Sequence, residues 1–168
     1  MAPASKFAVL GVPETYDLAT DELERRFREL SLRLHPDRFA KAPAAERVKA
    51  LGKSSELNDA YRTLRSPVGR AEHLLEIAGK GLHEGDRVEQ AFLLEILELR
   101  EALAEARAAG DTARLAALGA EMAARRDSVL GRLPELFAAG RLDEAKQALV
   151  ELRYFQRFLD EHAGKEAD

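Results

Sequence analysis

The triplet His35-Pro36-Asp37 lies between two helical patterns, one over residues 21–34 and a second that begins near Ala44. A proline disfavours the α conformation in the residue before it, so we expect the first helix to stop at or just before His35. An imidazole and a carboxylate then share a short loop between two antiparallel helices, where function often concentrates. Taken alone, the triplet also fits a plain helix end, with His35 favoured by the helix dipole and Asp37 as a turn residue.

The sequence on either side of the triplet predicts two long helices and two shorter ones. Apolar residues recur every three or four positions before it, as in an amphipathic helix. They are Leu23, Phe27, Leu30 and Leu34. Thr20 is the expected N-cap of this helix. A helix is predicted over 44–64, with one side formed by Val48, Leu51, Ser55, Asn58 and Tyr61. A short helix is expected over 7–10, and Ser66-Pro67 is typical of the start of another helix, which ends near Ala78.

Three long helical stretches follow, at about 87–109, 112–139 and 143–162. Gly110-Asp111 and Gly140-Arg141 separate them. Such short connections between long helices imply antiparallel neighbours, so the sequence predicts a three-helix bundle.

Composition and punctuation together predict an all-α protein with two domains. Ala, Leu, Arg and Glu dominate the 168 residues, and no segment alternates polar and apolar residues as a strand does. A segment punctuated by glycines over 79–86 is expected to be a linker. We therefore predict an N-terminal domain over 1–78, an antiparallel helical hairpin with the His-Pro-Asp loop, and a C-terminal three-helix domain over 87–168.

The first helix of the predicted bundle carries more apolar surface than a contact between two helices needs. Its core face is expected to hold Phe92, Ile96, Leu99 and Leu103. Off that face lie three leucines with acidic neighbours, namely Leu93, Leu94, Leu97, Glu98, Glu101 and Glu105. Two interpretations stand about even at this point: the leucines pack on the third helix, or they form a docking surface.

The last helix shows a similar surplus. Its core stripe is expected to consist of Ala145, Ala148, Leu149, Leu152, Phe155 and Leu159. Val150, Tyr154 and Phe158 fall on another flank, where tyrosine is suited to an interface. The alternative is an ordinary boundary tyrosine whose hydroxyl reaches water.

Charge and composition argue against several functions. The net charge is −4 without a long basic block, which argues against nucleic acid and a membrane surface as partners. There is no cysteine, and the four histidines lack metal-ligand spacing, so we expect no metal and no cofactor. His73 lies among apolar residues within a predicted helix and is expected at the boundary between core and surface rather than as a metal ligand, and His83 and His162 are expected in solvent. No transmembrane run and no signal-peptide core are present, so the expected location is the cytoplasm. No residue set for catalysis is found, and we expect a protein that is not an enzyme.

The neighbours of the triplet resemble a known module. Phe7-Ala8-Val9-Leu10-Gly11-Val12-Pro13 precedes it, and Asn58-Asp59-Ala60-Tyr61-Arg62-Thr63-Leu64 follows it. Together with the apolar stripe of the first long helix, they resemble the J-domain, which switches on the ATPase of chaperones of the DnaK/HscA class.

The whole chain resembles the HscB-type family of J-domain co-chaperones of iron–sulfur cluster assembly. The resemblance is carried by four stretches, which are 35–39, Thr63-Leu64-Arg65-Ser66-Pro67, Arg70-Ala71-Glu72 and the run 91–101, Ala-Phe-Leu-Leu-Glu-Ile-Leu-Glu-Leu-Arg-Glu. Members join a J-domain to a C-terminal three-helix bundle. They bind the IscU-type scaffold on which clusters are built and deliver it to an HscA-type chaperone. Arg38 stands where the family commonly has lysine, and the absence of an N-terminal cysteine metal site favours the bacterial type.

The resemblance implies two sets of contact residues. The chaperone is expected to contact His35, Pro36, Asp37 and Arg38, and a positive flank formed by Arg25, Arg26 and Arg33. The scaffold is expected to contact Leu93, Leu94, Leu97, Glu98, Glu101, Glu105 and Tyr154. The loop performs no chemistry, but biases the chaperone towards its hydrolysis-competent state. The three arginines also fit a solvated helix face balanced by Glu29.

Two other functions remain open at this stage. One is a general J-protein that feeds unfolded clients to a housekeeping chaperone. The other is a helical interaction protein whose His-Pro-Asp loop is inert. Stimulation of any such chaperone would favour the first, and absence of stimulation would favour the second.

Overall fold

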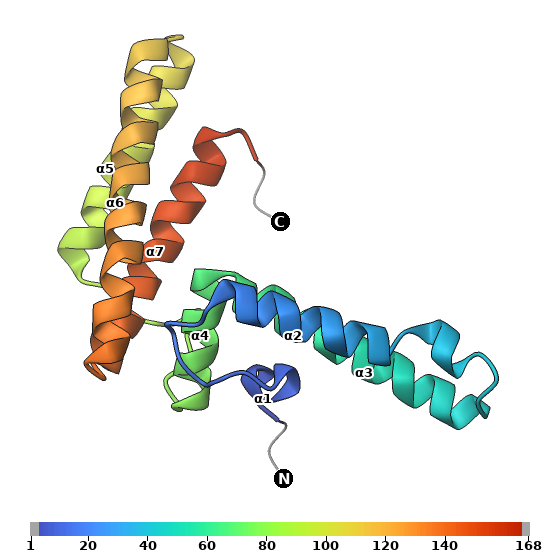
Figure 1. Cartoon of the computed structure of the whole chain (residues 1–168). Coiled ribbons are helices and arrows are strands. Elements are labelled where there is room, and N and C mark those ends of the chain that lie inside the picture. The colour runs from blue at the N-terminus through green and yellow to red at the C-terminus, as the bar shows by residue number, and fades with distance from the viewer. Residues whose placement is uncertain (1–3, 166–168) are drawn as a thin grey trace. The chain divides into compact units, whose positions relative to one another are not determined.

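The computed structural model describes residues 4–165, which form seven α-helices, one short 3-10 helix and no strand (Figure 1). The all-α class predicted from the sequence is confirmed. The chain divides into two compact units, of which the first ends at Gly81 and the second begins at Leu82. Over these described residues, no helix is both long enough and apolar enough to cross a membrane.

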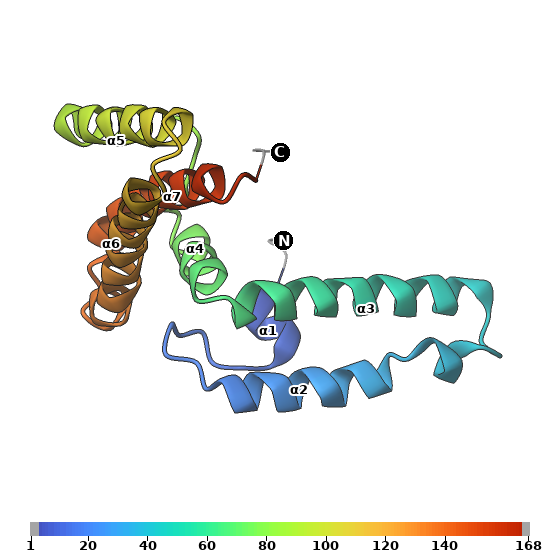
Figure 2. The same cartoon turned by 90° about the horizontal axis from the view of Figure 1, so that it is seen from above.

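The first unit is built on an antiparallel helical hairpin. Helices α2 (Thr20–Arg33) and α3 (Ala44–Arg65) lie side by side, and the loop between them contains the 3-10 helix η1 (Pro36–Phe39) (Figure 2). Helix α1 (Lys6–Leu10) packs against both, and α4 (Pro67–Ile77) packs against α3. Because α3 contacts every other element of the unit, it is the helix on which the loop and its supports are held.

The core of this unit lies between α1, α2 and α3. Its buried members are Phe7, Leu10, Val12, Leu18, Leu23, Leu57, Ala60 and Leu64. Phe27 and Tyr61 pack against it and stack on each other with ring centroids 4.0 Å apart. Leu30 and Leu34 also pack there, which confirms the stripe predicted for α2.

Two details of these helices differ from the prediction. Ala19 precedes α2 without a side-chain cap, and Thr20 is already helical. On α3, Val48 and Leu51, which the sequence placed along one side of the helix, are exposed. The buried positions are Ala50, Leu57, Ala60 and Leu64. The buried residues of α3 therefore include small alanines, which allow close packing, and none of the five residues of the predicted side.

The corner between α3 and α4 follows the predicted signals. Ser66 caps α4 by accepting a hydrogen bond of 3.2 Å from the Gly69 amide, and Pro67 occupies the first helical position. Gly69 is required by close packing, since a Cβ there would lie 2.5 Å from the Thr63 carbonyl oxygen.

Arg70 fastens this corner to the segment before α2. It is the buried charged side chain of the described residues, and it donates to the carbonyls of Leu64 at 3.0 Å and Tyr16 at 2.9 Å. Its guanidinium also lies 5.7 Å from the Tyr16 ring centroid. Burial lowers the pKa of Arg70, so these acceptors offset a real cost of desolvation.

The second unit is a three-helix bundle of α5 (Gln90–Ala108), α6 (Thr112–Ala138) and α7 (Leu142–His162), as predicted. Gly110 and Gly140 end α5 and α6 with φ of 64° and 69°, in the left-handed region that glycine adopts without strain. The central buried side chains are Ile96, Leu103, Leu118, Met122, Val129, Leu133, Leu149, Leu152, Phe155 and Phe158.

Three residues of α7 depart from the predictions. Val150 and Phe158, expected on an outer flank, are buried. His162, expected in solvent, has its Nε2 atom 2.7 Å from the Leu115 carbonyl oxygen. Its ring packs on Gly119, where a Cβ would lie 2.7 Å away. A helix wheel cannot show this contact, because it depends on a glycine in the neighbouring helix.

Arg70→Met tests the tie at the α3–α4 corner. We expect the first unit to lose about 2–4 kcal/mol of unfolding free energy, because two carbonyls lose a charged donor. Urea unfolding followed by helical circular dichroism measures the loss. Arg65→Met, at an exposed position of the same corner, is the matched control and should change little. Equal midpoints for the two variants would contradict the assignment.

Candidate functional site

Pro36 determines the geometry of the loop. Helix α2 ends at Arg33 with Leu34 as its C-cap, and His35 adopts φ −60° and ψ 133°, the extended conformation that a following proline favours. Pro36 then occupies the first position of η1. The His35 Nδ1 atom accepts a hydrogen bond of 3.3 Å from the Asp37 amide, so His35 acts as the cap of this short helix.

The two functional groups of the loop are presented to solvent. The side chains of His35 and Asp37 are 56% and 91% exposed, with Nδ1 and Oδ2 3.6 Å apart. Because Nδ1 is an acceptor, a neutral ring carries its proton on Nε2 and offers a donor there. Arg38 follows, exposed and without an ion pair among the described residues. The loop therefore offers a donor, a carboxylate and a cation to a partner, rather than an enclosed catalytic pair.

An apolar hollow of about 210 Å³ lies beside the loop. Its lining is Leu34, Pro36, Phe39, Arg47, Ala50, Leu51 and Ser54. The sequence analysis did not predict this feature, since it placed Leu51 along one side of the helix without assigning it a contact. Ala50, which is buried, marks the side of α3 that packs in the hairpin.

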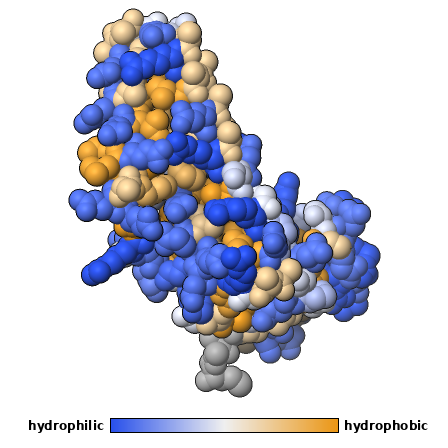
Figure 3. Space-filling view, turned by 90° about the vertical axis from the view of Figure 1, so that its left-hand side faces the viewer, coloured by the Kyte–Doolittle hydropathy of each residue, from blue (hydrophilic) through white to orange (hydrophobic). Residues whose placement is uncertain are grey.

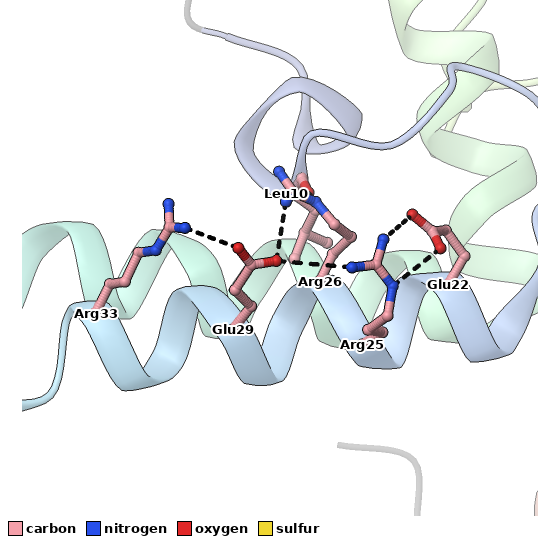
Figure 4. A network of polar contacts seen from close by, with 6 residues as sticks. All are labelled: Leu10, Glu22, Arg25, Arg26, Glu29 and Arg33. Carbon is pink, nitrogen blue, oxygen red and sulfur yellow. Dashed lines mark hydrogen bonds and ion pairs between the residues drawn. The ribbon is translucent and has the colours of Figure 1, made fainter.

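The predicted positive flank of α2 is an interleaved network of ion pairs (Figure 4). Arg25 pairs with Glu22 at 2.7 Å, and Arg33 pairs with Glu29 at 2.8 Å. Arg26 binds the same Glu29 at 3.1 Å. The hydrogen bond from Arg25 lowers the pKa of the Glu22 carboxyl, because it favours the charged form. The flank presents guanidinium groups whose charge is partly balanced within the helix.

Arg26 differs from its two neighbours because it also has a structural role. Its Nε atom donates to the Leu10 carbonyl at 3.2 Å, which ties α2 to the end of α1. Arg28, which the sequence analysis left out, is 73% exposed and pairs with Glu24 at 3.2 Å. It lies three positions after Arg25, so helix spacing places both on one outer face and would have found it.

The leucines picked out on α5 do lie outside the core. Leu93, Leu94 and Leu97 are 41%, 52% and 54% exposed, while Ile96 and Leu103 are buried as predicted. Figure 3 shows apolar surface of this kind between charged side chains over the C-terminal helices. The interpretation in which these leucines pack on the third helix of the bundle is wrong.

The acidic residues beside these leucines are largely unengaged. Glu98 and Glu101 are exposed and make no ion pair with the described residues, whereas Glu105 lies 3.4 Å from Arg114. A different carboxylate of the helix, Glu95, is held by Arg125 at 2.6 Å. Charge on this face is therefore left available at Glu98 and Glu101 in particular.

Tyr154 joins the α5 face from α7. Its ring meets Phe92 edge to face, with centroids 5.6 Å apart. Phe92 also contacts Phe155, and it directly precedes the exposed Leu93. The contact with Phe92 thus links Tyr154 to the first turn of α5. We use the name α5–Tyr154 face for the predicted residues of the two helices: Leu93, Leu94, Leu97, Glu98, Glu101, Glu105 and Tyr154. No group of three or more potential metal ligands occurs among the described residues.

Comparison with known proteins matches both units. Residues 5–73 match the family described as DnaJ domain, and residues 88–162 match the one described as HSCB C-terminal oligomerisation domain. The chain is 35% identical over 157 residues to the co-chaperone protein HscB homolog of Neisseria gonorrhoeae, covering 92% of this chain and 95% of the relative.

Solved structures agree over almost the whole length. Chaperone HscB from Vibrio cholerae superposes with a TM-score of 0.82 at 31% identity, covering 96% of each chain. Human co-chaperone protein HscB gives a TM-score of 0.85 at 27% identity, covering 97% of this chain and 84% of that one. A hairpin with an exposed His-Pro-Asp loop and these matches define a J-domain co-chaperone. The chain belongs to the HscB family, the co-chaperone family of iron–sulfur cluster assembly that its sequence resembles.

Replacing Leu93, Leu94 and Leu97 together by alanine tests whether they belong to the surface. We expect a small loss of stability, because these side chains already contact water. Leu103→Ala is the contrasting variant, since a buried leucine costs about 2–5 kcal/mol on truncation. Thermal unfolding of both variants measures the difference. A loss for the triple variant as large as that for Leu103→Ala would move the leucines into the core.

Proposed function

We propose that this protein, acting in the cytoplasm, binds an IscU-type iron–sulfur scaffold and delivers it to an HscA-type chaperone whose ATPase it stimulates. The observation that carries the proposal is the exposure of three leucines on α5, the helix whose Phe92 contacts Tyr154, in a member of the HscB family. The protein is not itself an enzyme in this proposal. It acts by bringing two partners together and by changing which state of the chaperone is favoured.

The His-Pro-Asp loop supplies the effect on the chaperone. Its donor at His35 and its carboxylate at Asp37 are held in a fixed relation by the hydrogen bond from the Asp37 amide and by Pro36. Stimulation follows if these groups bind the hydrolysis-competent state of the chaperone better than the resting state, because a ligand shifts an equilibrium only by its differential affinity. No bond is made or broken on the loop itself.

The outer face of α2 supports this contact electrostatically. Arg25, Arg28 and Arg33 are exposed and offer guanidinium groups to an acidic surface. Their carboxylate partners hold the side chains in place but reduce the net positive field. We therefore expect the arginines to orient the chaperone and to raise the rate of association, rather than to supply most of the binding affinity.

The α5–Tyr154 face supplies the contact with the scaffold. Leu93, Leu94, Leu97 and Tyr154 form its apolar centre, and Glu98 and Glu101 lie at its edge. An apolar centre with a charged rim is the usual anatomy of a specific interface. A few central side chains generally dominate the binding energy, and the rim sets partner choice and association rate.

His35→Gln tests the role of the loop. We expect this variant to keep its fold and its affinity for the scaffold, because an exposed loop side chain contributes little to the core. Stimulation of the HscA-type chaperone should be abolished, as measured by steady-state ATP hydrolysis. Lys41→Gln, an exposed substitution after the same loop, is the control. Full stimulation by His35→Gln would exclude the loop from the mechanism.

Leu97→Ala and Tyr154→Ala test the scaffold contact. We expect each to weaken scaffold binding by about 2 kcal/mol or more, as for central interface residues. Leu32→Ala, on the exposed side of α2, removes an equally exposed leucine from the other unit and should leave the affinity unchanged. Calorimetric titration with purified scaffold gives the comparison. Unchanged affinity for both α5 and α7 variants would remove this face from the binding site.

A further inference from the structure

Arg157 extends the α5–Tyr154 face beyond its apolar centre. It lies one turn after Tyr154 on α7, and its guanidinium carbon is 5.8 Å from the centroid of the Tyr154 ring. The same ring contacts Phe92 edge to face at 5.6 Å. Tyr154 is therefore held by an aromatic neighbour from α5 and covered by a cation from its own helix.

The guanidinium of Arg157 has no carboxylate to neutralise it. Arg157 is exposed and makes no ion pair with the described residues of the chain. Other arginines of the same unit are engaged: Arg125 binds Glu95 at 2.6 Å, and Arg100 binds Glu161. Arg157 thus differs from most arginines of this surface in that its charge is left available.

Two acidic residues share a hollow with this arginine, and one of them is engaged elsewhere. A polar hollow between the 83–86 segment and α7 is lined by His83, Glu84, Asp86, Val150, Arg153, Tyr154 and Arg157. Asp86 pairs with Lys146 at 3.0 Å and accepts a hydrogen bond from the His83 amide. Those two contacts, the His83 amide first, lower the pKa of Asp86. Glu84 is exposed and makes no ion pair among the described residues.

We propose that Arg157, in cation–π contact with Tyr154, is a carboxylate-binding position that recognises an acidic side chain of the scaffold. This rests on the scaffold binding proposed above and adds a specificity residue to it. A guanidinium is planar and offers parallel N–H donors that match a carboxylate in a bidentate pair. The attraction of the cation to the aromatic ring favours conformations of Arg157 that keep its guanidinium beside Tyr154.

Arg157 gives the two helices of the docking face unpaired charges of opposite sign. Phe92 contacts Tyr154 and Arg100 binds Glu161, so α5 and α7 run side by side in the same direction. Glu98 and Glu101 lie on α5, while Arg157 lies on α7. A partner that covers the apolar centre then needs a basic group towards α5 and an acidic group towards α7. Docking with these two groups exchanged would bring like charges together, so the two helices select one orientation of the scaffold.

Calorimetric titration of the full chain with a purified apo IscU-type scaffold tests the proposal. Arg157→Met keeps a flexible stem over the Tyr154 ring but removes the charge, and we expect about tenfold weaker binding, as for one charge-assisted contact. Arg157→Lys keeps the charge but lacks the parallel N–H donors of the guanidinium, so its affinity for the scaffold should lie between those of the wild type and Arg157→Met. Arg132→Met, an exposed arginine on α6 likewise without an ion pair among the described residues, should match the wild type.

Two further readouts separate a charge contact from a structural effect. Thermal unfolding should be unchanged in Arg157→Met, and raising the salt concentration should weaken scaffold binding of the wild type more than that of the variant. Glu84→Gln removes the carboxylate that shares the hollow and should leave the affinity unchanged or slightly higher. Equal affinities and equal salt dependence for wild type and Arg157→Met would overturn the proposal.

Three further outcomes separate a failure of the Arg157 role from a failure of scaffold binding itself. If Arg157→Met leaves scaffold binding intact but changes self-association in analytical ultracentrifugation, the occupant of this position is a second copy of the chain and the proposal is overturned. If Tyr154→Ala weakens scaffold binding and Arg157→Met does not, the proposed function stands and only the role of Arg157 fails. If the wild type itself does not bind the scaffold, both fail together.

Discussion

The steric conflict between Pro36 and a helical His35 is the constraint on which the functional end of the first unit depends. It stops α2, makes His35 extended and lets Pro36 begin a new short helix, so the chain can turn back into α3. The same turn places the His35 Nδ1 atom where it accepts from the Asp37 amide. A hydrogen bond within the loop thereby fixes the imidazole without using its Nε2 donor, and that donor stays available to a partner.

The support behind this loop comes from residues far away in the sequence. Helix α3 is the second helix of the hairpin. Arg70 holds the C-terminal end of α3 to the segment before α2 by donating to two backbone carbonyls, of Leu64 and Tyr16. Arg26 adds a second link, from α2 to the end of α1. The cost of burying Arg70 is offset only because both acceptors are present. The His-Pro-Asp loop therefore lies on a hairpin that the hydrogen bonds of Arg26 and Arg70 connect to neighbouring segments.

Local signals in the sequence were sufficient where one residue imposes a conformation or where apolar spacing is regular. The helix stop at Pro36 and the Ser66-Pro67 start of α4 were predicted, since each depends on its own segment. The spacing on α5 placed Leu97 off the core face but left its exposure open, and the family resemblance favoured the exposed position that the structure shows. Contacts between helices were not predictable in this way. The burial of Phe158 and the docking of His162 on Gly119 depend on what the neighbouring helix presents, and one wheel cannot show that.

Charge is handled differently on the two candidate surfaces, and the difference bears on how each would bind. On α2 the arginines are paired within the helix, so a partner must compete with Glu22 and Glu29 for them. On the α5–Tyr154 face, Glu98, Glu101 and the neighbouring Arg157 make no ion pair with the described residues, and the contact of Arg157 is with the Tyr154 ring. Paired arginines suit a contact that forms and breaks repeatedly, because each guanidinium has a carboxylate or water as its partner both in the free protein and in the complex. Unpaired charges around a fixed aromatic centre suit a contact that selects one partner in one orientation, since only a complementary surface removes their cost of desolvation.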